Sequence, residues 1–324
     1  MNANHLQPAF LHPGDRVALI APSYFLEGDT VNKAADAIRS WGFEPVVGKN
    51  VGKQWLHQYA GSVEERLSDL VWAYEDDTIR GILCTRGGYG TIQLLEHIPD
   101  SLYYLHPKWL IGYSDITSLH AQSVVSGSMS IHGAMGAQLV KHHLHGPTCQ
   151  LLRDLLMGKI PQYALSPLPY DQTGTGSGIL VGGNMATFSP LISTKYDFLQ
   201  YPEIILFIEE VEESAHHIDR MFHLLRLHGI MPHIKGIMMG DFTACGDEYR
   251  LGSIEKMLSY YTRELNIPVI TAFPAGHGNI NLPLIEGAWT TLRVTEQGST
   301  VSFDMEGDKN IVHIEDENGK RIVR

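Results

Sequence analysis

The sequence predicts an α/β protein with an N-terminal parallel-sheet domain flanked by helices and a smaller C-terminal mixed α/β domain with a β-rich end. Short apolar, β-branched runs alternate with amphipathic segments in the first half, a pattern typical of a parallel sheet covered by helices. A stretch rich in Pro, Gly, Thr and Ser then interrupts the alternation at 166–178, as a linker would. We therefore expect domains over 1–165 and 179–324.

The expected elements of the first half follow directly from hydrophobic periodicity. Strands are expected at 16–22, 44–48, 81–86, 109–111 and 129–133, where apolar runs are short and continuous. A helix is expected over 29–43, because Val31, Ala35, Ile38 and Trp41 recur at helical spacing. Ser62 opens a capping box with Glu65, which predicts the start of a second helix there.

The second half predicts fewer helices and more strands. Apolar runs at 203–210 and 234–242 are typical of buried strands, and an amphipathic helix is expected between them. Two alternating segments near the C-terminus predict β-hairpins, the second turning at Asn318-Gly319.

Composition and charge exclude several classes of partner. The chain has 24 basic and 36 acidic residues, a formal net charge of −12, so a nucleic-acid partner is not expected. No apolar stretch approaches the roughly 18 residues of a membrane span, and the first residues carry no secretory-signal pattern. Three widely spaced cysteines predict neither a disulfide framework nor a metal site. We expect a cytoplasmic protein.

Ser114 stands at a turn from an expected strand into an expected helix, in the segment KWLIGYSDITSLH. A serine there can cap the helix by accepting a backbone N–H. A serine on such a turn can also be an exposed nucleophile, with an oxyanion donor in the next residue. The segment alone leaves both interpretations open.

A serine nucleophile needs a base and an acid that orients the base. His277 lies between two glycines in a loop, and Glu209 ends an apolar strand, where an unpaired carboxylate would be costly. Each residue also has an ordinary explanation: a solvated loop histidine, and a carboxylate marking where the strand reaches water. Glu210 is a rival for the role of the acid.

The combined motifs resemble the LD-carboxypeptidase family of serine peptidases (family S66), which includes the microcin C self-immunity peptidases. The resemblance covers about residues 12 to 295, and its motifs occur in the order GDRVALIAPS, YAGSVEERLSDL, GILCTRGGYGTIQLLE, KWLIGYSDITSLH, IHGAMG, GGNMATFSPL, LFIEEVEE, IDRMF and GHGNINLPL. The residues after it, 296–324, have no counterpart in these motifs.

The resemblance implies a catalytic triad and an oxyanion hole. Its nucleophile falls on Ser114, its acid on Glu209 and its base on His277. Its oxyanion donors fall on the backbone N–H groups of Asp115 and Gly88. The acidic strand reads Glu-Glu here where the family has Glu-Asp, so Glu210 stays an alternative for the acid.

The expected activity is metal-independent serine hydrolysis, with no cofactor. By resemblance, the substrate is a murein tetrapeptide that loses its terminal D-alanine during peptidoglycan recycling, and the protein is a homodimer. A second substrate within the family is a microcin C-type aminoacyl-nucleotide, for which Trp109, Tyr163 or Tyr170 would have to stack on the base. A non-catalytic ligand-binding protein is the alternative of another class.

Three further motifs have weaker interpretations. Arg86 could bind a substrate carboxylate or form a structural ion pair. The RGGYG turn after it lacks the full dinucleotide-binding spacing. The histidines in KHHLHG (141–146) and AHH (215–217) are adjacent in sequence, and we expect no metal site from them.

Overall fold

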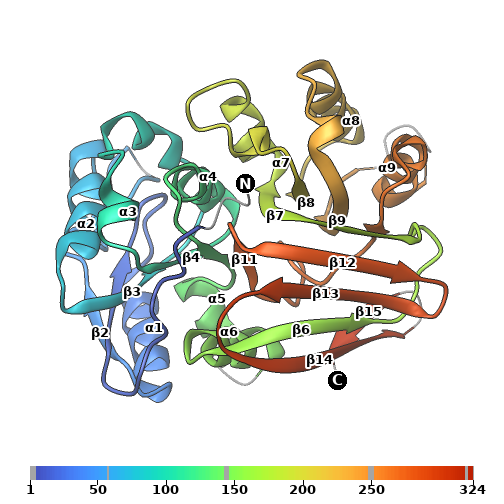
Figure 1. The fold of residues 1–324 in the computed structure, drawn as a ribbon. Coiled ribbons are helices and arrows are strands. Elements are labelled where there is room, and N and C mark those ends of the chain that lie inside the picture. The colour runs from blue at the N-terminus through green and yellow to red at the C-terminus, as the bar shows by residue number, and fades with distance from the viewer. Residues whose placement is uncertain (1–4, 57, 142–145, 247–251, 318–319, 324) are drawn as a thin grey trace. The chain divides into compact units, whose positions relative to one another are not determined.

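The computed structural model describes residues 5–56, 58–141, 146–246, 252–317 and 320–323. The chain forms two compact units, each shown in Figure 1. Unit 1 comprises Met1–Gly158 and Leu282–Ile285, and unit 2 comprises Lys159–Asn281 and Glu286–Arg324. Within the described residues, no helix has the length and apolar character that crossing a membrane requires. The α/β fold class is confirmed.

Unit 1 is built on a six-stranded sheet in the order β11-β5-β4-β3-β1-β2. Its strands are β1 (Arg16–Ile20), β2 (Glu44–Val47), β3 (Ile79–Cys84), β4 (Trp109–Gly112), β5 (Ser130–His132) and β11 (Leu284–Glu286). The pairings from β2 through β1, β3 and β4 to β5 are all parallel. Their carboxyl ends therefore share one edge, which is where such sheets bind ligands.

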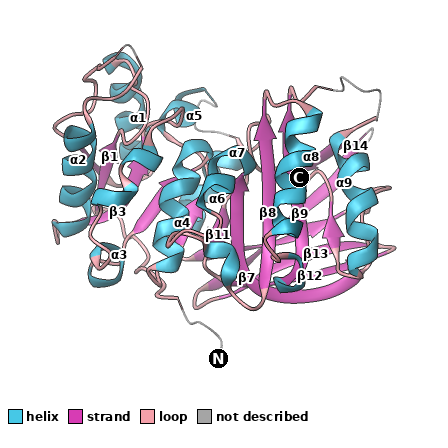
Figure 2. Cartoon of the chain, turned by 90° about the horizontal axis from the view of Figure 1, so that it is seen from above, coloured by secondary structure: helices cyan, strands magenta, loops and turns pink. Residues whose placement is uncertain are grey.

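Helices flank this sheet (Figures 1 and 2), with α1 packed against α5 and α2 against α3. The helices are α1 (Gly28–Ser40), α2 (Val63–Glu75), α3 (Leu102–Leu105), α4 (Thr117–Val125), α5 (Gly136–Lys141) and α6 (Pro147–Leu156), with 3₁₀ turns at Thr91–Gln93, Leu95–His97 and Ser114–Ile116. The predicted capping box of α2 is confirmed: Ser62 accepts from the Glu65 N–H, and Glu65 accepts from the Ser62 N–H.

Unit 2 is built on a nine-stranded mixed sheet in the order β10-β9-β8-β7-β12-β13-β6-β14-β15. Its strands are β6 (Lys159–Leu165), β7 (Gly174–Asn184), β8 (Ile204–Val211), β9 (Ile234–Thr243), β10 (Val269–Ile270), β12 (Trp289–Thr295), β13 (Gly298–Asp304), β14 (Asp308–Glu317) and β15 (Lys320–Val323). Strands β7 to β10 are parallel neighbours, so their carboxyl ends also share an edge.

The helices of unit 2 are fewer, and α8 packs against α7 and α9. They are α7 (Met185–Phe188), α8 (Ala215–Leu227) and α9 (Ile254–Thr262), with 3₁₀ turns at Ser189–Leu191, Phe198–Gln200, Met231–His233 and Arg263–Leu265. The two hairpins expected near the C-terminus are present as the antiparallel pairs β12–β13 and β14–β15. The Asn318-Gly319 turn lies outside the described residues.

The structure differs from the expected domain layout in two respects. Residues 174–178, expected in the linker, begin β7 and pair with β12. Unit 2 begins already at Lys159, and the tail that the motifs do not reach supplies β13 to β15. Unit 2 is consequently not smaller than unit 1.

Candidate active site

Ser114 occupies a strained backbone position directly after β4. Tyr113 is extended, with φ −157°, whereas Ser114 has φ +64°, in the left-handed region that costs a non-glycine residue energy. The 3₁₀ turn Ser114–Ile116 begins there, with Tyr113 at the N-cap position. Ser114 therefore does not take the helix-capping position, which was one of its two interpretations. The backbone has the sharp strand-to-helix turn of a nucleophile elbow.

The RGGYG turn after β3 lies against Ser114. A β-carbon at Gly87 would stand 2.9 Å from Ser114 Cβ and 3.1 Å from Ser114 Oγ. At Gly88, where φ is +127°, a β-carbon would stand 2.3 Å from the Tyr24 ring. Close packing against Ser114 thus explains Gly87, and close packing against Tyr24 explains Gly88.

Two backbone N–H groups beside Ser114 have no acceptor within the described part of the chain. They belong to Asp115, in the first turn of the 3₁₀ helix, and to Gly88. Such unsatisfied donors at the start of a helix and in a glycine turn are suited to binding an oxyanion.

The Asp115 side chain connects the loops around Ser114 through hydrogen bonds. Its buried Oδ2 accepts hydrogen bonds from Ser23 Oγ at 2.7 Å and from the Thr91 N–H at 3.0 Å. Thr91 Oγ1 also donates to the Asp115 carbonyl. Burial raises the pKa of Asp115, and these hydrogen bonds oppose that rise. The loops after β1, β3 and β4 are therefore tied together at one carboxyl group.

In unit 2, Glu209 and His277 form a buried hydrogen-bonded pair. Glu209 Oε2 lies 2.6 Å from His277 Nδ1, and the Glu209 side chain has no solvent exposure. Burial of His277 lowers its pKa, but the hydrogen bond and the charge of Glu209 outweigh this effect, so that the pKa is raised overall. A carboxylate at Nδ1 orients the imidazole in the way that a catalytic base requires.

Glu210 makes a different set of contacts. Its Oε1 accepts from Asn184 Nδ2 at 2.6 Å and its Oε2 from the Ala186 N–H at 2.8 Å. The β8–β9 register shifts between Ile208 and Glu210, and such an irregularity redirects side chains. The described hydrogen bond to His277 comes from Glu209, and Glu210 anchors the start of α7.

The loop around His277 is shaped by two more carboxyl contacts. A β-carbon at Gly276 would stand 2.9 Å from Glu209 Oε2, and one at Gly278 would stand 2.4 Å from Asp241 Oδ2. Asp241 also accepts the Gly278 N–H at 3.1 Å. Burial raises the pKa of Asp241 to about 7, with Glu209 adding to the rise and the Gly278 N–H opposing it.

Arg86 lies beside the nucleophile and forms no ion pair with a described residue. Its guanidinium carbon is 5.7 Å from the centre of the Tyr24 ring, and its Nε donates to the Gly87 carbonyl at 3.3 Å. The structural ion pair that the sequence left open is thus absent among these residues, and the guanidinium is free to take a carboxylate ligand.

Other residues considered from the sequence have structural roles or lie outside the description. Trp109 and Tyr163 are buried in the cores of their units, which contradicts a base-stacking role for either. The described residues contain no group of three or more His, Cys, Asp or Glu side chains suited to a metal ion, and residues 142–145 of the KHHLHG motif are not described. A hollow of about 390 Å³ between β6, β13 and β14 contains none of the candidate residues.

Sequence reasoning missed the supporting residues Ser23, Thr91, Asn184 and Asp241. Asp241 carried the same signal as Glu209, because it also comes at the end of a buried strand that precedes a loop. Ser23 lies after β1 and Thr91 lies after β3, the neighbour of β4 in the parallel sheet, but serine and threonine after a strand are too common to single out.

Comparison with known proteins identifies both halves of the chain. Residues 17–133 match the LD-carboxypeptidase N-terminal domain, and residues 177–292 match the LD-carboxypeptidase C-terminal domain. A putative carboxypeptidase of Synechocystis sp. is 34% identical over 93% of this chain and 98% of its own length. A probable murein peptide carboxypeptidase of Bacillus subtilis is 31% identical over 91% of this chain and 94% of its own length.

Solved structures show the same fold. A muramoyltetrapeptide carboxypeptidase from Oxalobacter formigenes superposes with a TM-score of 0.81 at 23% identity, covering 91% of this chain and 99% of its own. A mutant of the microcin C7 self immunity protein MccF, solved with adenosine monophosphate, gives 0.79 at 21% identity over 94% and 99%. Because both family domains match in order and relatives above 30% identity span almost the whole chain, the protein belongs to the LD-carboxypeptidase family of serine-type peptidases.

Proposed function

We propose that the protein is a metal-independent serine LD-carboxypeptidase that releases the terminal D-alanine of a murein tetrapeptide in peptidoglycan recycling. The observation that carries the proposal is the buried Glu209–His277 hydrogen bond, because an imidazole oriented by a carboxylate is the base that a serine nucleophile requires. The name of the Bacillus subtilis relative supports the murein substrate.

In this mechanism, Ser114 Oγ attacks the carbonyl carbon of the amide while His277 Nε2 takes the hydroxyl proton. The same imidazole then delivers the proton to the leaving amine of D-alanine, and water completes the cycle by the same route. Glu209 holds Nδ1–H and stabilises the imidazolium. The N–H groups of Asp115 and Gly88 stabilise the tetrahedral oxyanion, each by roughly 3 kcal/mol.

Arg86 is a candidate for the residue that makes the enzyme specific for a free C-terminal carboxylate. Its guanidinium has no ion-pair partner in the described residues and stands in the turn that contacts Ser114 through Gly87. We propose that it binds the free carboxylate of the terminal residue. Arg86→Ala should then weaken cleavage of a free-carboxylate substrate far more than that of the amidated analogue, and equal losses on both would contradict the assignment.

The decisive experiment measures D-alanine release from purified murein tetrapeptide by the wild type and by Ser114→Ala, with and without chelator. We expect release by the wild type that chelator does not change and that the variant lacks. Release that persists in Ser114→Ala would show that another residue is the nucleophile. Release lost with chelator would overturn the metal-independent mechanism.

The second candidate, a self-immunity hydrolase acting on an aminoacyl-nucleotide, is tested on the same pair of proteins. Its solved representatives share the fold with this chain at identities near 21%, whereas relatives of higher identity carry murein carboxypeptidase names. Cleavage of an aminoacyl-nucleotide amide without D-alanine release would replace the first proposal. A non-catalytic binding protein would cleave neither.

We include a cytoplasmic location and a homodimer in the proposal. The support for both is the family resemblance together with the expected substrate, a product of cell-wall turnover. Light scattering of the purified chain measures the oligomeric state, and a single protomer mass would contradict the homodimer.

A further inference from the structure

Unit 1 carries four aromatic side chains in mutual contact, which we call the aromatic cluster: Tyr24, Trp55, Tyr59 and Tyr89. The Tyr59 ring is the centre, with ring centroids 5.8 Å from Tyr24, 5.9 Å from Trp55 and 6.3 Å from Tyr89. The residues come from loops that follow β1, β2 and β3. Loops at the carboxyl edge of a parallel sheet are where ligands bind.

The aromatic cluster adjoins the proposed nucleophile. The Tyr24 ring packs on Gly88, one residue from the Gly87 position that contacts Ser114. Arg86, between β3 and this turn, lies over the Tyr24 ring. A substrate with its scissile bond at Ser114 therefore has the aromatic cluster within a short distance on the same unit.

The outer rings of the aromatic cluster are accessible to solvent. Trp55 is 43% exposed and Tyr89 is 49% exposed, although each could lose apolar surface by packing inward. An exposed group of rings beside a catalytic residue is typical of a binding surface. Exposed rings bind a ligand well only where the loop that carries them is held in place, because a fixed loop loses little entropy on binding.

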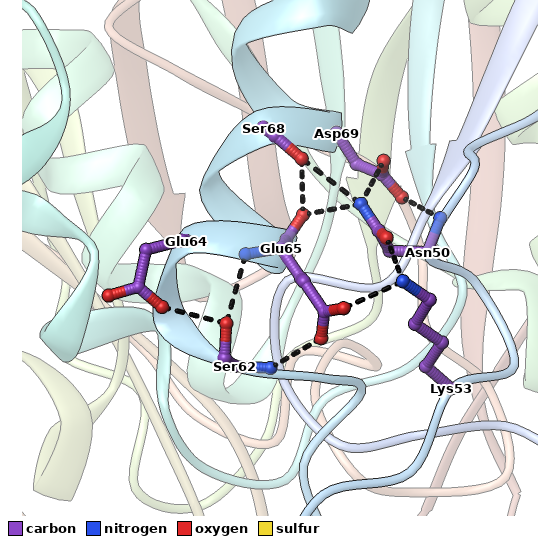
Figure 3. A network of polar contacts seen from close by, with 7 residues as sticks. All are labelled: Asn50, Lys53, Ser62, Glu64, Glu65, Ser68 and Asp69. Carbon is purple, nitrogen blue, oxygen red and sulfur yellow. Dashed lines mark hydrogen bonds and ion pairs between the residues drawn. The ribbon is translucent and has the colours of Figure 1, made fainter.

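Figure 3 shows how that loop is held. Asn50 donates through Nδ2 to the Glu65 carbonyl and to Asp69 Oδ1, both at 2.9 Å. Lys53 Nζ bridges Asn50 Oδ1 at 2.7 Å and Glu65 Oε1 at 2.6 Å. Asp69 Oδ2 accepts the Asn50 N–H at 2.9 Å. The start of the loop is thus fastened to the first two turns of α2.

Backbone hydrogen bonds hold three further described residues of the loop, Trp55, Tyr59 and Ala60. The N–H of Trp55 donates to the Tyr59 carbonyl at 2.9 Å, and the Tyr59 N–H donates back at 3.1 Å. The Ala60 N–H then donates to the Ser23 carbonyl at 3.0 Å. A loop fastened in this way presents Trp55 and Tyr59 in a fixed arrangement, which lowers the entropy lost when a ligand binds.

The ring orientations favour a saturated ring as the ligand over a flat heteroaromatic one. The contacts of Tyr59 have interplanar angles of 80° to Tyr24, 45° to Trp55 and 51° to Tyr89, so none of these pairs forms a parallel slot. Trp and Tyr offer an apolar face with a polar tip. A pyranose has the complementary form, with C–H groups on its faces and hydroxyls around its edge.

We propose that the aromatic cluster is a subsite for the sugar ring of a sugar-bearing peptide substrate. The inference rests on the proposed function and extends it, since murein peptides are attached to a muramic acid at their N-terminus. Three residues separate that sugar from the scissile bond, about 10 Å of extended chain. From Tyr24, which packs on Gly88, successive ring centroids lie 5.8 Å away at Tyr59 and a further 5.9 Å away at Trp55, so the aromatic cluster extends over a comparable length.

The test compares kcat/KM for N-acetylmuramyl tetrapeptide with kcat/KM for the free tetrapeptide. Trp55→Ala should lower the ratio of these values roughly five- to tenfold, the effect of losing one aromatic contact, mainly by raising KM for the sugar-bearing substrate. Tyr104→Ala is the matched control, because Tyr104 is 60% exposed on α3 of the same unit but outside the aromatic cluster. This control should leave the ratio unchanged.

An unchanged ratio in Trp55→Ala, or an equal loss of kcat for both substrates, would overturn the proposal. Calorimetry with Ser114→Ala and Ser114→Ala/Trp55→Ala separates it from the proposed function, because binding is measured without turnover. Trp55-dependent preference for the muramyl peptide would support the subsite even if no D-alanine is released. Trp55-dependent binding of adenosine monophosphate, without that preference, would assign the aromatic cluster to a nucleobase and reject the sugar.

Discussion

The two units prepare their parts of the proposed chemistry in different ways. In unit 1, Ser114 is set by backbone conformation: a left-handed φ of +64°, a turn that only glycine fits at Gly87, and a fixed Asp115 beneath it. In unit 2, His277 is set by charge, with Glu209 hydrogen-bonded to Nδ1 and Asp241 on the adjoining backbone. The serine is held mainly by steric fit, with the Asp115 carboxyl group joining the surrounding loops, whereas the histidine is held by carboxyl groups that also change its pKa.

This difference separates two kinds of functional sensitivity. A change at the Gly87 turn of unit 1 should alter the amount of activity without moving its pH dependence, because it touches no titrating group. A change at Glu209, Glu210 or Asp241 of unit 2 should move the pH dependence as well, because the charges of these three groups raise the pKa of His277. The predictions below test that division, beginning with the largest expected effect.

Glu209→Gln should lower kcat/KM about a thousandfold or more, the scale seen when a triad carboxylate is replaced by an amide. The acid limb of the pH–rate profile should also move to lower pH, since loss of the Glu209 charge lowers the pKa of His277. Pre-steady-state and steady-state assays across pH 5 to 9 measure both effects.

Glu210→Gln is the matched comparison. Glu210 accepts hydrogen bonds from Asn184, Ala186 and Val211. Replacing its carboxylate by the glutamine amide should therefore lower the free energy of unfolding by about 1–3 kcal/mol. Most of the activity should remain. If Glu210→Gln were the more damaging to catalysis, the acid would have to be reassigned from Glu209.

Gly87→Ala tests the steric half. Its new methyl group would lie 2.9 Å from Ser114 Cβ, so the serine or the turn must shift, and a displacement of this order should lower kcat about a hundredfold. The pH optimum should stay where it is. Gly28→Ala is the control, because a β-carbon there meets no other atom within 4 Å. A shifted pH optimum in Gly87→Ala would contradict the proposed difference between the units, in which a steric change leaves the pH dependence unaltered.

The fold was largely predictable from sequence because apolar periodicity reports burial directly. The main departure lies at Gly174–Gly178, which composition indicated as linker. There the glycines are needed for close strand packing: a β-carbon at Gly176 would stand 1.8 Å from the Lys235 carbonyl oxygen, and one at Gly178 2.7 Å from Glu203. A single sequence does not distinguish a glycine in a flexible linker from a glycine that lets a strand pack closely against a neighbouring backbone.

The proposed triad was predictable only through the combined motifs, and its supporting groups were not. Choosing between Glu209 and Glu210 required the local register shift of β8 against β9, which adjacent identical residues cannot reveal. Asp115 was predicted for its backbone N–H, yet its carboxyl group joins the loops of Ser23 and Thr91. Those contacts depend on strand order, which is a long-range property of the chain.

Asp241→Asn should have a smaller effect that appears mainly in the pH profile. The amide keeps an acceptor for the Gly278 N–H but removes a charge that raises the pKa of His277. The pKa of Asp241 is about 7, with Glu209, His277 and Glu255 as its charged neighbours. Asp241 carries its charge mainly above this pH, so the rates of the wild type and the variant should differ most above neutral pH. NMR titration of the His277 ring should give a lower pKa in the variant. An unchanged pKa would mean that Asp241 supports the loop without acting on the base.

Glu286→Gln should leave activity unaltered and change stability alone, because this carboxyl group of unit 2 contacts none of the proposed catalytic residues. Glu286 is fully buried, and neither of its carboxyl oxygens has a hydrogen-bond partner among the described residues. Burial raises its pKa to about 8, and the Gly182 amide offsets this only in part. Between about pH 4.5 and 8 the folded protein keeps a proton that the unfolded chain releases, so wild-type stability falls across that interval. Glutamine cannot ionise, and the stability difference in favour of the variant should therefore grow from pH 5 to 9 in urea denaturation. A constant difference would show that Glu286 does not ionise there. A growing difference at constant kcat/KM would show that ionisation of Glu286 affects the stability of unit 2 without affecting catalysis, in contrast to Glu209 and Asp241, which raise the pKa of His277.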